Sequence, residues 1–259
     1  MLVDRPLDPL CAAVMVALDQ SLTRAGYALL VATTVTAEES LARGRELLGR
    51  GVEALVCWTA AHVPSLEEHA AVQSVPWIVF DHPVRSAPAL TASSGRRGGT
   101  LLACRYLLSL GHRRFAIVAG TDLAGEVREA LATQATAIET PLVNHGEDLD
   151  GAQASVGALL DQGRATAIVS GSDLLAFGAL RECAVRGVSV PGDISVVGLG
   201  DSPPARCASP PLTSIRVAAE EIGALTAEAL LLLIAGGTPV AVEIAAKLVL
   251  RESTGPAPV

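Results

Sequence analysis

Short apolar runs alternate with helical patterns along the chain. The runs of strand length are YALLVAT (27–33), ALVCW (54–58), WIVFD (77–81), FAIVAG (115–120), TAIVSG (166–171) and ISVVGLG (194–200). Apolar residues recur at helical spacing over 9–25, 37–50, 98–110, 151–163, 173–187 and 217–235. Strands that are apolar throughout are typical of parallel sheets with helices on both faces. The pattern therefore predicts an α/β protein built from repeated strand–helix–strand units.

The helical stretches have well-marked faces and ends. In the first stretch, every fourth residue is apolar: Leu10, Val14, Leu18 and Leu22. This spacing places them on one face of a helix. Glycines follow five of the stretches: Gly26, Gly51, Gly111, Gly163 and Gly187. Because glycine commonly ends a helix, each stretch is predicted to stop there.

The first strand is unusually short. Only Met1, Leu2 and Val3 precede the polar segment DRPLDP, whereas an average strand has about five or six residues. We expect that more chain precedes Met1 in the intact gene.

The composition limits the functional class. The 259 residues, 50% hydrophobic and 3% aromatic, suffice for one large or two small domains. No apolar run reaches the roughly 18 residues of a membrane span, and the start of the chain does not resemble a signal peptide. The net charge is −8, and basic residues cluster only in GHRRF (111–115) and Arg96–Arg97. Because nucleic acid is bound by basic surfaces, we do not expect this chain by itself to bind DNA.

Cysteine usage indicates a reducing compartment. There are five cysteines, an odd number, and none forms a CxxC pair. Most lie in apolar surroundings, which is typical of buried, reduced thiols. We therefore expect a cytoplasmic protein.

The sequence has no motif of catalysis or cofactor binding. GxSxG, HExxH and GxxxxGK[ST] do not occur. The segment GLGDSP (198–203) ends on Pro203, where the dinucleotide-binding GxGxxG motif has glycine. We expect neither an enzyme nor a bound metal or cofactor.

Several segments together resemble the effector-binding domain of LacI/GalR-type transcription regulators. They are RELLGRGVEALV (45–56), RYLLSLGHRRFAIVAG (105–120), SDLLAFGALRECAVRGVSVPGDISVVG (172–198), GLGDSPPARCASPPLTSI (198–215) and LVLREST (248–254). They occur in the family's order and spacing over nearly the whole chain. The resemblance implies two Rossmann-like lobes with parallel sheets, of the periplasmic-binding-protein type I, joined by three crossover segments.

The resemblance also implies lobe boundaries. The crossovers are expected near 120–122, 213–216 and 236–240. The N-terminal lobe would comprise 1–120 with 215–236, and the C-terminal lobe 121–213 with 239–252. The segments at 120–122 and 236–240 are expected to act as hinges, because Gly120, Gly236 and Gly237 suit a backbone that changes conformation. The family's helix-turn-helix head, which binds DNA, is expected to be absent from this chain.

Ligands of open α/β sheets bind beyond the carboxyl ends of the strands, and the resemblance implies an interlobe cleft there. Matching motif to motif gives these ligand-binding candidates: Asp8, Leu10, Asp81, Arg128, Ser172, Asp173, Gly200 and Asp201. Arg128 matches a family arginine whose guanidinium offers several rigid donors. Three of the other candidates have alternative roles: Asp173 and Asp201 as helix N-caps, and Asp81 as a turn residue. Arg128 is alternatively a solvated helix residue.

The family's usual polar contacts are partly missing. Gly95-Arg96 stands for the common Asp-Asn, Ser172-Asp173 for Asn-Asp, Gly200-Asp201 for Asp-Asp, and Leu131-Ala132 for Gly-aromatic. At Gly95, Ser172 and Gly200, a polar ligand contact of the family has become Gly or Ser. The loss of these three hydrogen bonds to a buried sugar would weaken binding by roughly 3–6 kcal/mol, or about 10²- to 10⁴-fold. We therefore predict weak binding of simple hexoses and pentoses.

The function expected from the resemblance is ligand-dependent regulation of transcription. A small effector would change the lobe angle and so the DNA affinity of the intact protein. The expected partners are a small-molecule effector, a second copy in a homodimer, and operator DNA bound only through the helix-turn-helix head. Two alternatives are an exported solute-binding protein of an uptake system and a degenerate, ligand-free dimerisation module.

Overall fold

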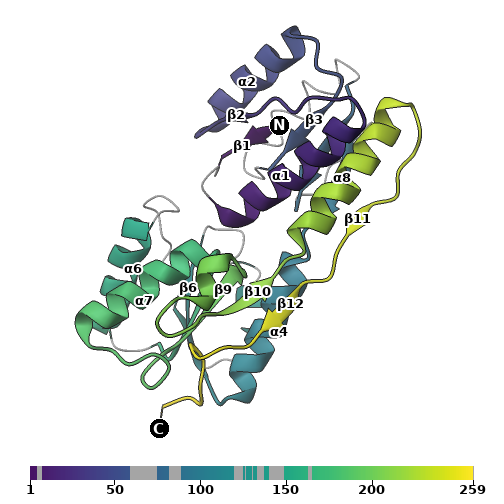
Figure 1. The fold of residues 1–259 in the computed structure, drawn as a ribbon. Helices are drawn as coiled ribbons and strands as arrows, with labels where there is room; N and C mark the ends of the chain where they lie inside the picture. Colours follow the sequence, from purple (N-terminus) through teal and green to yellow (C-terminus); the bar gives the residue numbers. More distant parts are fainter. Residues whose placement is uncertain are drawn as a thin grey trace. The chain divides into compact units, whose positions relative to one another are not determined.

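The computed structural model forms two compact units, each with its own parallel sheet (Figure 1). It describes residues 1–4, 8–58, 75–81, 89–119, 125, 127–129, 131–132, 137–139, 149–162 and 165–258. The first unit comprises Met1–Ser94 and Ala218–Ile244, and the second comprises Gly95–Val217 and Ala245–Val259. The chain therefore passes between the units three times, as the resemblance implied.

The first unit is a six-stranded sheet with a packed helix pair. Its elements are β1 (Leu2–Val3), α1 (Pro9–Arg24), β2 (Ala32–Thr33), α2 (Ala37–Gly49), β3 (Leu55–Cys57), β4 (Trp77–Phe80), β5 (Ala89–Ser93), α8 (Ala219–Ile234) and β11 (Val242–Glu243). The strands lie in the order β11-β5-β4-β3-β1-β2, all parallel.

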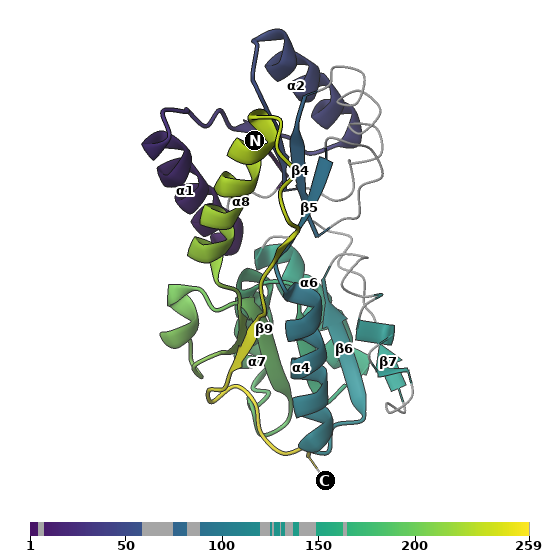
Figure 2. The same cartoon turned by 90° about the vertical axis from the view of Figure 1, so that its right-hand side faces the viewer.

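Helices α1 and α8 lie side by side in both views (Figures 1 and 2). A Cβ atom on Gly223 of α8 would lie 2.8 Å from the Val14 carbonyl oxygen of α1, so glycine permits this close approach. All four apolar residues predicted for one face of α1 are buried, which confirms the helical pattern.

The second unit is a second six-stranded sheet. Its elements are α4 (Arg96–Ser109), β6 (Arg114–Val118), β7 (Ala137–Glu139), α6 (Leu149–Gln162), β8 (Ala167–Ser170), α7 (Asp173–Arg186), β9 (Ser195–Gly200), the 3-10 helix η1 (Pro203–Arg206), β10 (Thr213–Arg216) and β12 (Lys247–Val249). The strand order is β12-β10-β9-β8-β6-β7, with only β12 antiparallel to its neighbour among these pairs.

Alternation along the strands builds a core on both faces of this sheet. Ala116 and Val118 of β6 pack with α6 and α7, and the intervening Phe115 and Ile117 are buried on the opposite face. Helix α4 lies across the sheet (Figure 2) and contacts β8, β10 and β12. A Cβ atom on Gly99 of α4 would lie 2.3 Å from Ile215 Cγ2. The predicted α/β class, with parallel sheets between helices, is confirmed.

The boundaries of the two units differ from those predicted. Residues 95–119, expected in the first lobe, belong to the second unit because β6 pairs with β7 and β8 of its sheet. The chain crosses at 94–95, 217–218 and 244–245. The crossing at 217–218 directly follows the segment near which one crossover was predicted, 213–216. The segment 236–240 lies within the first unit, and the predicted hinge at 120–122 falls outside the described residues. Gly236, with φ +78°, ends α8 within the first unit.

The C-terminal segment is bonded into the second unit. Ser253 accepts a hydrogen bond from Thr213 N at 2.8 Å and donates one to the Val196 carbonyl at 2.6 Å. His112 is fully buried, and its Nε2 donates to the Gly255 carbonyl at 3.0 Å. No helix among the described residues has both the length and the apolarity to cross a membrane.

His112 makes the stability of the second unit depend on pH. Burial lowers the pKa of His112 from its ordinary value near 6.5, although the hydrogen bond to Gly255 opposes the shift. The unfolded chain therefore binds a proton at this residue more readily than the folded chain does. The free energy of unfolding should fall as the pH drops below about 6.5. Urea unfolding at pH 7.5 and pH 5.5 should show a smaller loss for His112→Gln than for the wild type; equal losses would contradict this.

Candidate functional site

The predicted site residues are divided between the two units. Asp8, Leu10 and Asp81 belong to the first unit; Arg128, Ser172, Asp173, Gly200 and Asp201 belong to the second. Most lie where strands of the parallel sheets end.

Asp81 joins the ends of two strands in the first unit. It follows β4 with a left-handed backbone, φ +51°. Its Oδ1 accepts from Ser94 N at 2.8 Å and its Oδ2 from Ser94 Oγ at 2.6 Å. Asp81 thus holds the end of β5, and the turn role considered for it stays a prediction because residues 82–88 lie outside the described residues. Asp81 is exposed to solvent, and contact between its carboxylate and a ligand stays a prediction.

Asp8 and Leu10 begin helix α1. Asp8 is the N-cap, and its Oδ1 accepts from Leu10 N at 2.8 Å. The Leu10 side chain is only 7% exposed and belongs to the core of the unit. Asp8 is therefore the more accessible of the two candidates.

Ser172 and Asp173 divide their roles at the start of α7. Ser172 is the N-cap, because its Oγ accepts from Leu175 N at 3.2 Å. Asp173 occupies the first helical position and is 1% exposed. Its Oδ1 accepts from Ser214 Oγ and its Oδ2 from Ser202 N, each at 2.6 Å. The capping role considered for Asp173 therefore belongs to Ser172, and Asp173 ties β10 and the loop after β9 to α7.

Burial raises the pKa of the Asp173 carboxyl, and the charge of Asp201 raises it further. The hydrogen bonds from Ser214 and Ser202 act in the opposite direction because they favour the charged form. The carboxylate fits only because residue 198 lacks a side chain: a Cβ atom on Gly198 would lie 2.3 Å from Asp173 Oδ1. The first glycine of GLGD is explained by this contact.

Asp201 is the centre of an ion-paired group. Its side chain is 4% exposed, and its two carboxylate oxygens pair with Arg216 Nε and Arg251 Nη2. Its backbone, at φ +48°, donates from N to Ser214 Oγ at 3.0 Å. Asp201 is not a helix cap, since Ser202 precedes η1. The carboxylate read from the sequence as a ligand contact is thus already bonded within its own unit.

Gly200 contributes backbone only. Its φ of +125° is a conformation that side chains rarely adopt. At this position the second unit therefore offers a ligand no carboxylate.

Arg128 lies on the surface of a short helical segment. The residue is exposed, and the neighbouring Glu129 pairs with Arg97 of α4 at 2.9 Å. This exposure suits both a solvated residue and a ligand contact, so the ligand role stays a prediction.

Five residues of these networks were not predicted: Ser94, Ser202, Ser214, Arg216 and Arg251. Ser214 and Arg216 alternate with buried Ile215 along β10 and so share a face. The motifs PPLTSI and LREST contain or adjoin three of the five, but a motif does not show which carboxylate its side chains meet.

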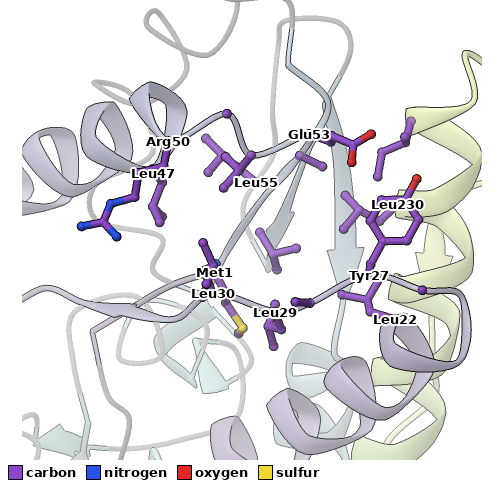
Figure 3. Close-up of a pocket in the computed structure, with 17 residues that line it drawn as sticks. Met1, Leu22, Tyr27, Leu29, Leu30, Leu47, Arg50, Glu53, Leu55 and Leu230 are labelled. Atoms are coloured by element: carbon purple, nitrogen blue, oxygen red, sulfur yellow. The ribbon is translucent and has the colours of Figure 1, made fainter.

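Two cavities lie elsewhere within the units. One, of about 340 Å³, lies at the amino ends of β1 and β3 and is lined largely by apolar side chains, with Tyr27, Arg50 and Glu53 as polar members (Figure 3). The other, of about 670 Å³, is a groove on the outer side of α7. Neither is lined by any predicted site residue. Among the described residues, no group of three or more His, Cys, Asp or Glu is placed to hold a metal.

Comparison with known proteins decides the family. Residues 104–254 match the model of the periplasmic binding protein-like domain. The chain is 33% identical to the HTH-type transcriptional regulator MalR of Streptomyces coelicolor over 99% of this chain and 79% of that protein. The chain belongs to the LacI family of transcription regulators. It is also 29% identical to the regulator CelR of Thermobifida fusca, over 95% of this chain and 76% of CelR.

Solved structures of LacI-family proteins share the fold. The structure of a CelR–cellobiose complex has a TM-score of 0.82 at 27% identity, covering 97% of this chain and 83% of that one. A LacI family regulator from Enterococcus faecium with bound ribose has a TM-score of 0.83 at 23% identity, covering 98% of each chain. The chain is the effector-binding part of a LacI-family regulator, as the sequence motifs implied.

The contact between residue 198 and Asp173 gives a stability prediction. Gly198→Ala should lower the free energy of unfolding by about 1–3 kcal/mol, because the added methyl group displaces the buried carboxylate. Gly49→Ala is the matched control, since a Cβ atom there meets nothing within 4 Å. Urea unfolding of both variants measures the effect, and wild-type stability of Gly198→Ala would show that the contact imposes no constraint.

Proposed function

We propose that this chain binds a small effector through the carboxyl-end edges of its two sheets and transmits that binding to operator DNA. The DNA contact is made by a helix-turn-helix segment of the intact LacI-family regulator, acting in the cytoplasm. The observation that carries the proposal is the placement of Asp81, Asp201 and their partners at strand ends of a LacI-family fold. Open α/β sheets bind ligands at such ends.

Effector binding controls DNA affinity only if the effector prefers one arrangement of the regulator. A ligand shifts such an equilibrium by its differential affinity for the two arrangements and by nothing else. The chain crosses between its units at 94–95, 217–218 and 244–245, and these crossings are where we propose that the backbone conformation adjusts.

The effector is proposed to be a saccharide or a compound derived from one. This is supported by the cellobiose and ribose named for two relatives of the same fold. Neutral hexoses and pentoses should bind weakly, because Gly200 supplies no side chain and the carboxylates of Asp173 and Asp201 are already bonded. The same observation favours one rival function, a ligand-free dimerisation module.

A thermal-unfolding screen separates the proposal from its rival. The panel contains monosaccharides, disaccharides, sugar acids and sugar phosphates, each at 10 mM. At least one compound should raise the melting temperature, because binding to the folded state stabilises it. Arg128→Gln should remove most of that shift, whereas Arg105→Gln, which changes an exposed arginine of α4, should retain it. A panel without any stabilising compound would favour the ligand-free module.

We propose further that the chain forms a homodimer. The groove on α7 supports this, because it is apolar and includes Phe177, Val185 and Cys207. Val185 is 67% exposed, and exposed apolar patches mark interaction sites.

Val185→Asp tests the homodimer, since a charge in the groove would have to be buried on association. Sedimentation equilibrium should show a dimer for the wild type and at least a tenfold weaker association for the variant. Val240→Asp, at an exposed valine of the first unit, is the control and should remain dimeric. A monomeric wild type, or a fully dimeric Val185→Asp variant, would count against a dimer through this groove.

A further inference from the structure

Among the described residues at the adjacent ends of β9 and β10, the charge that is accessible to solvent is positive. Asp173 is 1% exposed and the Asp201 side chain 4% exposed, so both carboxylates are withdrawn from solvent. The Arg216 side chain, in contrast, is 53% exposed. A ligand that approaches the ends of β9 and β10 therefore meets the Arg216 guanidinium group before it meets the carboxylate of Asp173 or Asp201.

Arg216 is held in place by one side of its guanidinium group. Its Nε donates to Asp201 Oδ2. Within the described part of the chain, no hydrogen bond joins Nη1 or Nη2 of Arg216 to another residue. Arg251 differs, because its Nη1 donates to the Leu212 carbonyl at 2.6 Å and its Nη2 to Asp201. Arg251 is thus structural, whereas Arg216 is fixed in position and keeps donors for a ligand.

The ion-paired group has an excess positive charge. One carboxylate, Asp201, is paired with two guanidinium groups. The net charges of the two units also differ. The first unit has 6 Lys and Arg against 14 Asp and Glu, whereas the second has 13 Lys and Arg against 13 Asp and Glu.

These groups suit an acceptor-rich ligand better than a neutral sugar. The hydroxyl protons of a sugar need acceptors, yet Gly200 has no side chain and the two carboxylates are occupied. The free edge of a guanidinium group matches two oxygens of a carboxylate or phosphate.

We infer that the effector is an anion whose carboxylate or phosphate is bound by Arg216. This inference rests on the proposed function, because it names the ligand class of the same site. Carboxylate and phosphate share the recognition chemistry, so the test includes both.

The test is isothermal titration calorimetry of the full chain at 50 mM NaCl. The probes are matched sets of the same sugars: the neutral hexose or pentose, its uronic or aldonic acid, and its monophosphate. At least one anion should bind at least tenfold more tightly than its neutral parent. Arg216→Gln should weaken the binding of that anion by about 10- to 100-fold and leave the affinity for the neutral parent unchanged. The affinity of Arg216→Lys for the anion should lie between those of the wild type and Arg216→Gln.

Arg105→Gln is the control, since it removes an equal charge from an exposed position of α4. The melting temperature of each variant shows whether it is folded, and Asp201 retains its pair with Arg251 in every Arg216 variant. Tighter binding of a neutral sugar would overturn the anion inference and leave the effector-binding proposal standing. An anion that loses no more affinity in Arg216→Gln than in Arg105→Gln would overturn the role of Arg216. Absence of binding by every probe would overturn both proposals.

Discussion

The buried carboxylate of Asp173 organises the edge of the second sheet. A charge removed from water is tolerated only when it is well hydrogen-bonded, and here the Ser214 hydroxyl and the Ser202 amide provide those bonds. These bonds connect α7 to β10 and to the loop that follows β9. Residue 198 must be glycine to leave space for the carboxylate. One buried group therefore joins a helix, a strand and a loop, and it explains why residue 198 is glycine.

The hydrogen bonds of Asp173 also fix the position of the more exposed groups, through Ser214 and Asp201. Ser214, fixed by Asp173, accepts a hydrogen bond from the Asp201 amide at 3.0 Å. The Asp201 carboxylate then aligns Arg216 and Arg251. The interior of the unit thus determines which groups a ligand can reach. Buried Asp173 positions Asp201 through Ser214, and Asp201 in turn positions the guanidinium group of Arg216.

The local structure was largely predictable, because periodicity is a local property. The predicted helices at 9–25, 37–50 and 173–187 agree with α1, α2 and α7 to within one residue at each end. Strand lengths were less predictable: YALLVAT forms only a two-residue strand, β2, because its partner β1 also has two residues. The unit boundaries were not predictable, since assigning β6 to a sheet depends on which strands lie beside it.

The candidate site was predictable in its positions and less so in its chemistry. Asp81, Asp173 and Asp201 do lie at strand ends, as motif matching placed them. Their partners come from segments between 13 and 50 residues away in the chain, and no local pattern shows that these carboxylates are occupied. Because the carboxylates of Asp173 and Asp201 are already bonded, the exposed Arg216 becomes the candidate for ligand binding.

Hydrogen exchange measured by mass spectrometry tests most directly the claim that ligand binds at the strand ends. The chain would be compared with and without a saturating concentration of the compound that stabilises it most in the thermal screen. We expect slower exchange at 198–202 and 214–217 of the second unit and at 80–81 and 93–95 near the ends of β4 and β5. Slower exchange confined to 26–30 and 50–56, around the cavity at the amino ends of β1 and β3, would contradict it.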